Sequence, residues 1–77
     1  MTTVRVFVTL KPSLLDSAGK AVTGSLQKLG FGEVAETRIG KLIELQLEDF
    51  AEARVQAMCE RLLANPVIED FSFEVVK

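Results

Sequence analysis

The fold depends on residues 33–48, EVAETRIGKLIELQLE, where two extended runs meet at Gly40. Glycine reaches positive φ at no steric cost, which suits a tight reversal between antiparallel strands. After Gly40 the residues alternate with a period of two. One face carries Lys41, Ile43, Leu45 and Leu47, and the other carries Leu42, Glu44, Gln46 and Glu48. The stretch therefore predicts a β-hairpin with one face on a core.

A strand and a helix precede this hairpin. Residues 3–11 alternate and are rich in valine, which predicts a strand that Pro12 ends. Residues 17–29 then carry apolar side chains at helical spacing, with Asp16 or Ser17 as the N-cap. Gly30 stands where a left-handed residue ends many helices.

A second helix and a last strand follow it. Asp49 and Glu52 have the spacing of a capping box, and Pro66 sets the limit of the helix. Residues 68–76 alternate again and predict a strand. The apolar stripe of the helix comprises Val55, Met58, Cys59, Leu62 and Leu63.

The predicted order is β-α-β-β-α-β in a single domain, residues 1–77. It is typical of an α+β, ferredoxin-like sandwich: an antiparallel sheet of four strands with two helices on one face. The uncovered face would carry Phe7, Leu42 and Val76 as its apolar points. These three are candidates for self-association, while the alternative is a solvated face with scattered apolar residues.

Size and composition limit the classes of function. A chain of 77 residues with one cysteine and no histidine has neither a disulfide nor an imidazole metal site to supplement a small core, which favours association. A net charge of −2 and the lack of Trp and Tyr disfavour nucleic-acid binding. No apolar run is long enough to span a membrane, and the first residues do not resemble a signal peptide, so we expect a cytoplasmic protein.

The sequence offers little for catalysis. The absence of histidine excludes Ser-His and Cys-His dyads, and Cys59 lies on an apolar stripe that predicts burial. The glycines do not have the spacing of a phosphate-binding loop. Lys11, Arg38 and Lys41 lie near predicted turns and could bind a phosphate or a partner's carboxylates. The alternative is that they are ordinary exposed charges.

Several short motifs, in order along nearly the whole chain, resemble one family. They are Leu10-Lys11-Pro12 with Asp16, Gly19-Lys20-Ala21-Val22, Leu29-Gly30-Phe31, Arg38-x-Gly40-Lys41-x-Ile43-Glu44-Leu45, and Cys59-Glu60-x-Leu62-Leu63-Ala64-Asn65-Pro66-Val67-Ile68-Glu69. Together they are similar to the PurS family, the small subunits of phosphoribosylformylglycinamidine synthase.

The resemblance implies a non-catalytic subunit of an ATP-dependent C–N ligase in purine biosynthesis. It would form a dimer, join a glutaminase subunit (PurQ) to a large synthetase subunit (PurL), and support ammonia transfer between them. It would bind no cofactor itself, since the large subunit uses ATP and magnesium. Within this hypothesis, Lys11, Arg38, Gly40 and Lys41 are the residues expected near a partner or a substrate.

Two other functions remain open from the sequence. One is a stand-alone dimeric regulatory module that binds a small molecule, for which a ligand would raise thermal stability. The other is a small acylphosphatase-like hydrolase, which the residues after the first strand (KPSLLDSAGK) disfavour because they lack a phosphate-binding pattern.

Overall fold

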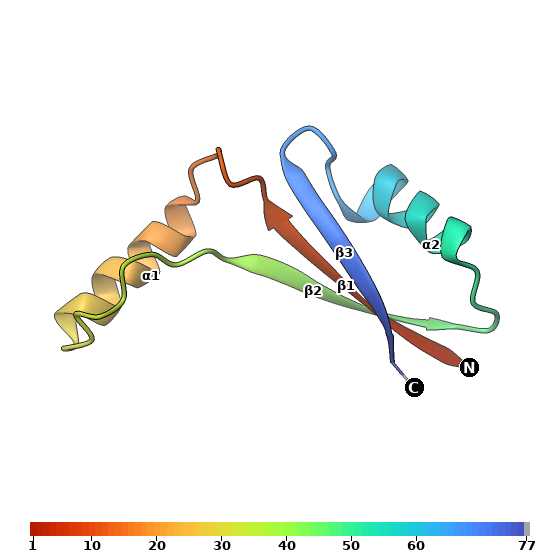
Figure 1. Cartoon of the computed structure of the whole chain (residues 1–77), viewed down its shortest axis with the longest axis horizontal. Helices are drawn as coiled ribbons and strands as arrows, with labels where there is room; N and C mark the ends of the chain where they lie inside the picture. Colours follow the sequence, from red (N-terminus) through yellow and green to blue (C-terminus); the bar gives the residue numbers. More distant parts are fainter. Residues whose placement is uncertain (77) are drawn as a thin grey trace.

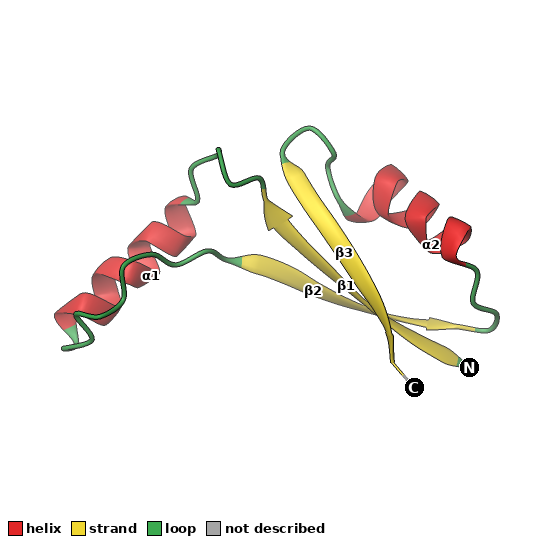
Figure 2. Ribbon diagram, viewed as in Figure 1, coloured by secondary structure: helices red, strands yellow, loops and turns green. Residues whose placement is uncertain are grey.

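A computed structural model describes residues 1–76. Its strands form one antiparallel sheet in the order β2-β1-β3, with two helices (Figures 1 and 2). The elements are β1 (Thr2–Leu10), α1 (Ser17–Lys28), β2 (Gly40–Leu47), α2 (Glu52–Met58), its π-helical extension η1 (Cys59–Leu63), and β3 (Glu69–Val76). The predicted α+β class with an antiparallel sheet is confirmed, in the order of a ferredoxin-like unit with one strand fewer.

The predicted hairpin is wrong. Residues 33–39 form no strand, and the backbone at Gly40 does not have positive φ. Gly40 is instead the first residue of β2, paired with Thr9 of β1. The physical reason is that residues 33–39 lie along α1, where the Gln27 amide donates to the Val34 carbonyl at 2.9 Å, and no strand within residues 1–76 pairs with them. Alternation alone could not show which surface this segment would meet.

The ends of α1 are those that the sequence predicts. Asp16 is the N-cap, and its Oδ1 accepts a hydrogen bond from the Gly19 amide at 2.8 Å. At the other end Gly30 has a φ of 103°. The Gly30 amide donates to the Gln27 carbonyl at 3.1 Å and the Phe31 amide to the Leu26 carbonyl at 3.0 Å. These two bonds form a Schellman motif, which satisfies the last carbonyls of the helix.

The start of α2 differs from the prediction. Its N-cap is Ala51, without a side-chain hydrogen bond, so the expected capping box of Asp49 and Glu52 does not form. Asp49 lies in the bend that leads from β2 to the helix. The helix continues through η1, closed by a bond from the Ala64 amide to the Cys59 carbonyl at 2.9 Å. Ala64 is already extended, so the helix ends before Pro66 as predicted.

The core lies between the sheet and α2. Its fully or almost fully buried residues are Val4, Val6, Val8, Val55, Cys59 and Ala64. The half-buried apolar residues around them are Ile43, Leu45, Leu47, Leu63, Phe71 and Phe73. The predicted alternation of β1 and β2 and the burial of Cys59 are thereby confirmed. In β3 the alternation holds for Phe71 and Phe73, whereas Val75, predicted on the same face, is exposed. No residue of α1 belongs to this core, so the expectation that both helices cover one face holds for α2 only.

The chain is elongated. Residues 17–39, here called the arm, extend away from the sheet as α1 and the segment that returns along it (Figure 1). The radius of gyration is 15.6 Å, against about 11.5 Å for a compact chain of this length. In the described residues no helix is both long and apolar enough to cross a membrane.

Candidate partner-binding site

The arm is attached to the sheet by two side chains, Asp16 and Arg38. Arg38 donates to the carbonyls of Leu14 and Lys11, each at 3.1 Å, and at 3.5 Å to that of Leu10. Asp16 caps α1 and accepts a second hydrogen bond from the Ile39 amide at 2.6 Å. These contacts connect the segment before α1 to the one before β2, and they set how the arm leaves the sheet.

The Asp16 carboxylate is stabilised in its charged form. The hydrogen bond from the Ile39 amide lowers its pKa most, followed by that from the Gly19 amide, and the Arg38 charge adds to them. Burial acts in the opposite direction, and the net effect is a pKa below the ordinary 3.8. Asp16 is therefore an anionic junction at neutral pH.

The structure places the predicted candidates on two sides of this junction. Arg38 contacts Lys11 through the Lys11 carbonyl, so these two lie together. Lys41 lies in β2 opposite Val8, and its Nζ is 3.8 Å from Glu69 Oε2. Gly40 makes close packing possible, because a Cβ there would be 2.5 Å from the Val8 carbonyl oxygen. A role for these four residues beside a partner or substrate stays a prediction.

The self-association candidates lie on the predicted uncovered face. Phe7 pairs with Leu42, and both side chains are exposed, whereas Val76 pairs with Thr3 farther along β1. Between them, Arg5 Nε and Glu44 Oε2 form an ion pair at 3.0 Å. The face is thus a small apolar pair next to a charged one, and self-contact through it stays a prediction.

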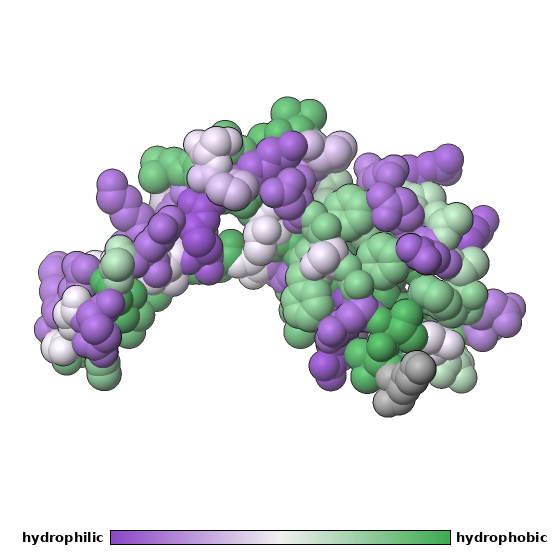
Figure 3. Space-filling view, in the orientation of Figure 1, coloured by the Kyte–Doolittle hydropathy of each residue, from purple (hydrophilic) through white to green (hydrophobic). Residues whose placement is uncertain are grey.

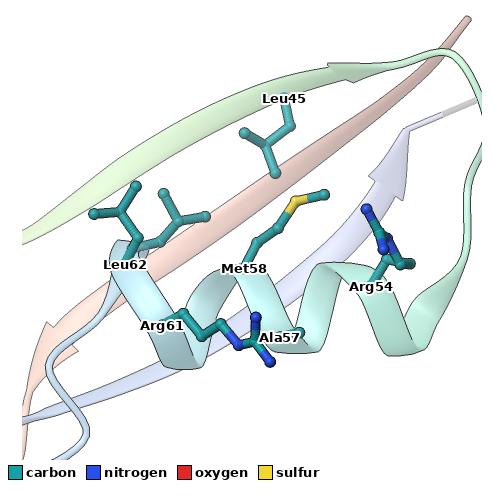
Figure 4. Close-up of a pocket in the computed structure, with 7 residues that line it drawn as sticks. Leu45, Arg54, Ala57, Met58, Arg61 and Leu62 are labelled. Atoms are coloured by element: carbon teal, nitrogen blue, oxygen red, sulfur yellow. The ribbon is translucent and has the colours of Figure 1, made fainter.

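A groove that the sequence did not predict lies between α2 and β2. It has a volume of about 510 Å³, and Leu45 and Met58 face each other across it (Figure 4). Leu62 is 84% exposed at this groove, although its place in the apolar stripe predicted burial. The remaining lining residues are Arg54, Ala57, Arg61 and Leu63. The apolar stripe from Val55 to Leu63 continues past the end of α2, and this extra length was the only feature of the sequence that could have indicated the groove. Figure 3 shows the molecule as an arch with the arm at one end and the sheet at the other. Apolar surface is visible at the sheet end.

The described residues offer surfaces for binding and no evident reactive group. Burial raises the pKa of the Cys59 thiol, and the nearby Glu60 charge raises it further, so the thiolate is disfavoured. Within residues 1–76 no three His, Cys, Asp or Glu side chains gather as metal ligands. In the part of the chain that the structure describes, β2 and β3 are the outer strands of the sheet. Together with the exposed arm and the open groove, they define a small α+β module whose surfaces suit contact with other proteins.

Comparison with known proteins gives the family. The chain belongs to the PurS family: the family's profile, described as phosphoribosylformylglycinamidine (FGAM) synthase, matches residues 3–77. A Synechocystis protein named as the PurS subunit of that synthase is 52% identical over 75 residues, covering 92% of this chain and 75% of the relative. The Bacillus subtilis PurS subunit is 47% identical, covering 94% and 89%.

Solved structures agree with this assignment. A crystal structure of Bacillus subtilis PurS has a TM-score of 0.89 at 44% identity, with all of both chains covered. The structure described as PurLQS from Thermotoga maritima contains a chain with a TM-score of 0.86 at 25% identity, covering 97% of this chain and 96% of that one.

Proposed function

We propose that this chain is the non-catalytic small subunit of phosphoribosylformylglycinamidine synthase in purine biosynthesis. Its partners are a glutaminase subunit (PurQ), a large synthetase subunit (PurL) and a second copy of itself. ATP and magnesium are used by the large subunit, and the complex works in the cytoplasm. Membership of the family and the likeness to a chain of PurLQS support this assignment.

One structural observation carries the proposal: among the described residues, the core includes no residue of the arm. α1 contributes nothing to the core, and Leu29 and Phe31 at its end are 74% and 49% exposed. A domain of this size has little stability to spare, so exposed apolar surface on a projecting element favours contact with other chains. A protein that works by joining others needs such surfaces more than it needs a reactive centre.

The physical role of such a subunit follows from the chemistry of ammonia. Ammonia that escapes into bulk water is protonated and loses its nucleophilicity, so a glutaminase and a synthetase must be held in a closed, fixed contact. A rigid sheet with a braced arm can hold two larger proteins at a constant geometry. Arg38 and Asp16, which brace the arm, are positioning residues in this account.

The test compares glutamine-dependent with ammonia-dependent synthesis by the assembled complex. Arg38→Ala and Lys41→Ala are expected to reduce the glutamine-dependent rate while synthesis from added ammonia is kept, because only the first requires coupled subunits. Lys28→Ala, an exposed cation on α1 without an ion pair among the described residues, is the matched control.

The experiment tests the role of Arg38 and Lys41 separately from the function proposed for the whole chain. Full coupling in both variants with normal assembly would remove Arg38 and Lys41 from the coupling role. Failure of the wild-type chain to restore glutamine-dependent synthesis to the other two subunits would refute the proposed function itself.

A further inference from the structure

β3 is an outer strand of the sheet, and within residues 1–76 no strand pairs with its outer edge. It pairs with β1 in an unbroken antiparallel register from Glu69 to Val76. Outer strands of natural proteins often carry a lysine, a proline or a bulge, each of which prevents another strand from joining them. The eight residues of β3 contain none of these three features. Its outer edge is therefore open to an extended segment.

Hydrogen bonds at the start of β3 show which of its backbone groups point outward. The Lys11 amide donates to the Ile68 carbonyl at 2.9 Å, so these two residues form a hydrogen-bonded pair. The Glu69 amide donates to the Asn65 carbonyl at 2.7 Å and therefore points away from β1. Because bonded and non-bonded pairs alternate in an antiparallel ladder, every second residue after Glu69 also directs its amide and carbonyl outward. These outward residues are Phe71, Phe73 and Val75.

The outward residues also define the side chains that a joining strand would need. Phe71 and Phe73 are half-buried against the core, and Val75 is 39% exposed beside them. Within residues 1–76, the hydrogen bonds outside the sheet do not use the amides of these three residues. A strand that joins antiparallel to β3 places one side chain opposite each of them, on the same face. An apolar side chain at every second position of the joining strand would match this face.

The other face of β3 is acidic, with Asp70 and Glu74 both exposed. Neither takes part in an ion pair among residues 1–76, since Arg5, which lies opposite Glu74, is bound to Glu44. The two charged residues of the other outer strand, Lys41 and Glu44 of β2, are both paired. A second copy of β3 would bring carboxylates beside carboxylates, which is unfavourable across a strand pair. The charge of the β3 edge therefore favours a basic segment.

We propose that the outer edge of β3 binds an extended basic segment of a different protein, which joins the sheet antiparallel to β3. The bound segment alternates apolar side chains, beside Phe71 and Phe73, with lysine or arginine beside Asp70 and Glu74. Hydrogen bonds to the outward backbone groups supply affinity, and the alternating side chains supply selectivity. The inference goes beyond the proposed function, because it assigns a binding edge and the chemistry of its ligand without requiring the synthase.

The first test titrates the full-length chain with two blocked peptides of about eight residues, one alternating valine with lysine and the other valine with glutamate. Calorimetry measures affinity, and the amide signals of the labelled chain locate the contact. The lysine peptide is expected to bind about tenfold tighter or more, and to shift the amides of β3. Equal affinity of the two peptides, or shifts on β2 in place of β3, would overturn the proposal.

Charge reversal tests the acidic face directly. Asp70→Lys combined with Glu74→Lys is expected to reverse the preference, so that the glutamate peptide binds more tightly. Glu33→Lys combined with Glu48→Lys changes the net charge equally at exposed positions outside β3, and it is the matched control. A preference that both double variants reverse would show attraction to the charge of the whole chain, and would contradict a site on β3.

Backbone changes test the hydrogen bonds of the joining strand. In an antiparallel pair the valine amides of the lysine peptide face β3 and its lysine amides face away. Methylation of the valine nitrogens should weaken binding about tenfold or more, whereas methylation of the lysine nitrogens should leave it unchanged. Val75→Pro removes one outward amide at an edge position that accepts proline, and it should also weaken binding, with Val75→Ile as its control. Equal affinity of the two methylated peptides for the wild-type chain would overturn the proposal.

Discussion

Two glycines on α1 show how strongly single residues depend on their surroundings. A Cβ at Gly19 would collide with the Thr37 carbonyl and lie 2.9 Å from the Asp16 carboxyl group, whereas a Cβ at Gly24 would meet nothing within 4 Å. We expect Gly19→Ala to loosen the arm and lower the melting temperature. Gly24→Ala should stabilise α1 by roughly 0.5–1 kcal/mol, since alanine loses less entropy in a helix. Circular dichroism melts of both variants make the comparison, and equal shifts of the same sign would contradict it.

Asp16 makes the junction of the arm sensitive to acid. Its folded-state pKa is lowered mainly by the Ile39 amide and then by the Gly19 amide, so the carboxylate stabilises the fold above its ordinary pKa of 3.8. That stabilisation is lost as the pH falls through the lower, folded-state value. We expect Asp16→Asn to lower the melting temperature at pH 7 and to reduce the difference from wild type as the pH falls below about 4. Melting curves at a series of pH values test this. Parallel profiles for the two proteins would show that the Asp16 charge does not contribute.

At the scale of elements, the sequence predicted the features that depend on neighbouring residues, namely the ends of α1 and the buried face of β1. The caps of α1 follow from Asp16 and Gly30, which act within a few residues of themselves. The alternation in β1 predicted which residues face the core because that face has period two. The hairpin failed since residues 33–39 contact α1 instead of a strand. Alternation states which side chains share a face, and only tertiary contacts decide whether the face meets a sheet.

In the candidate site, too, local patterns could be predicted from the sequence and tertiary contacts could not. The sequence predicted that Phe7 and Leu42 share the uncovered face, because register follows from the pattern. It could not predict the carbonyl partners of Arg38, which lie 24 to 28 residues away in the chain. The groove was missed because Leu62 fits the apolar stripe of α2 and yet lies outside the core. The stripe therefore extends beyond what the sheet of the same chain covers, and the sequence does not show where that limit falls.

The arm and the sheet should differ in local stability. β1 is the central strand and carries the buried Val4, Val6 and Val8, whereas α1 packs only on the segment that returns along it. We expect the amides of α1 in the dilute chain to exchange with solvent faster than those of β1, because opening the arm exposes little apolar surface. Hydrogen exchange followed by mass spectrometry measures both segments in one experiment. Equal protection of α1 and β1 at low concentration would contradict an arm that contributes no residue to the core of its own chain.

At the scale of the whole molecule, the shape predicts that stability depends on protein concentration. A compact chain of this length has a radius of gyration of about 11.5 Å, and the single chain has 15.6 Å with extents of 47 × 28 × 13 Å. If two copies complete each other, folding and association are linked, and the melting temperature rises with total concentration. A tenfold increase favours the dimer by about 1.4 kcal/mol, which corresponds to several degrees for a small domain. Melting the wild type over a hundredfold range of concentration should show this rise. A wild-type melting temperature that does not change across the range would mean that the elongated chain is stable alone and that its arm serves a partner of another kind.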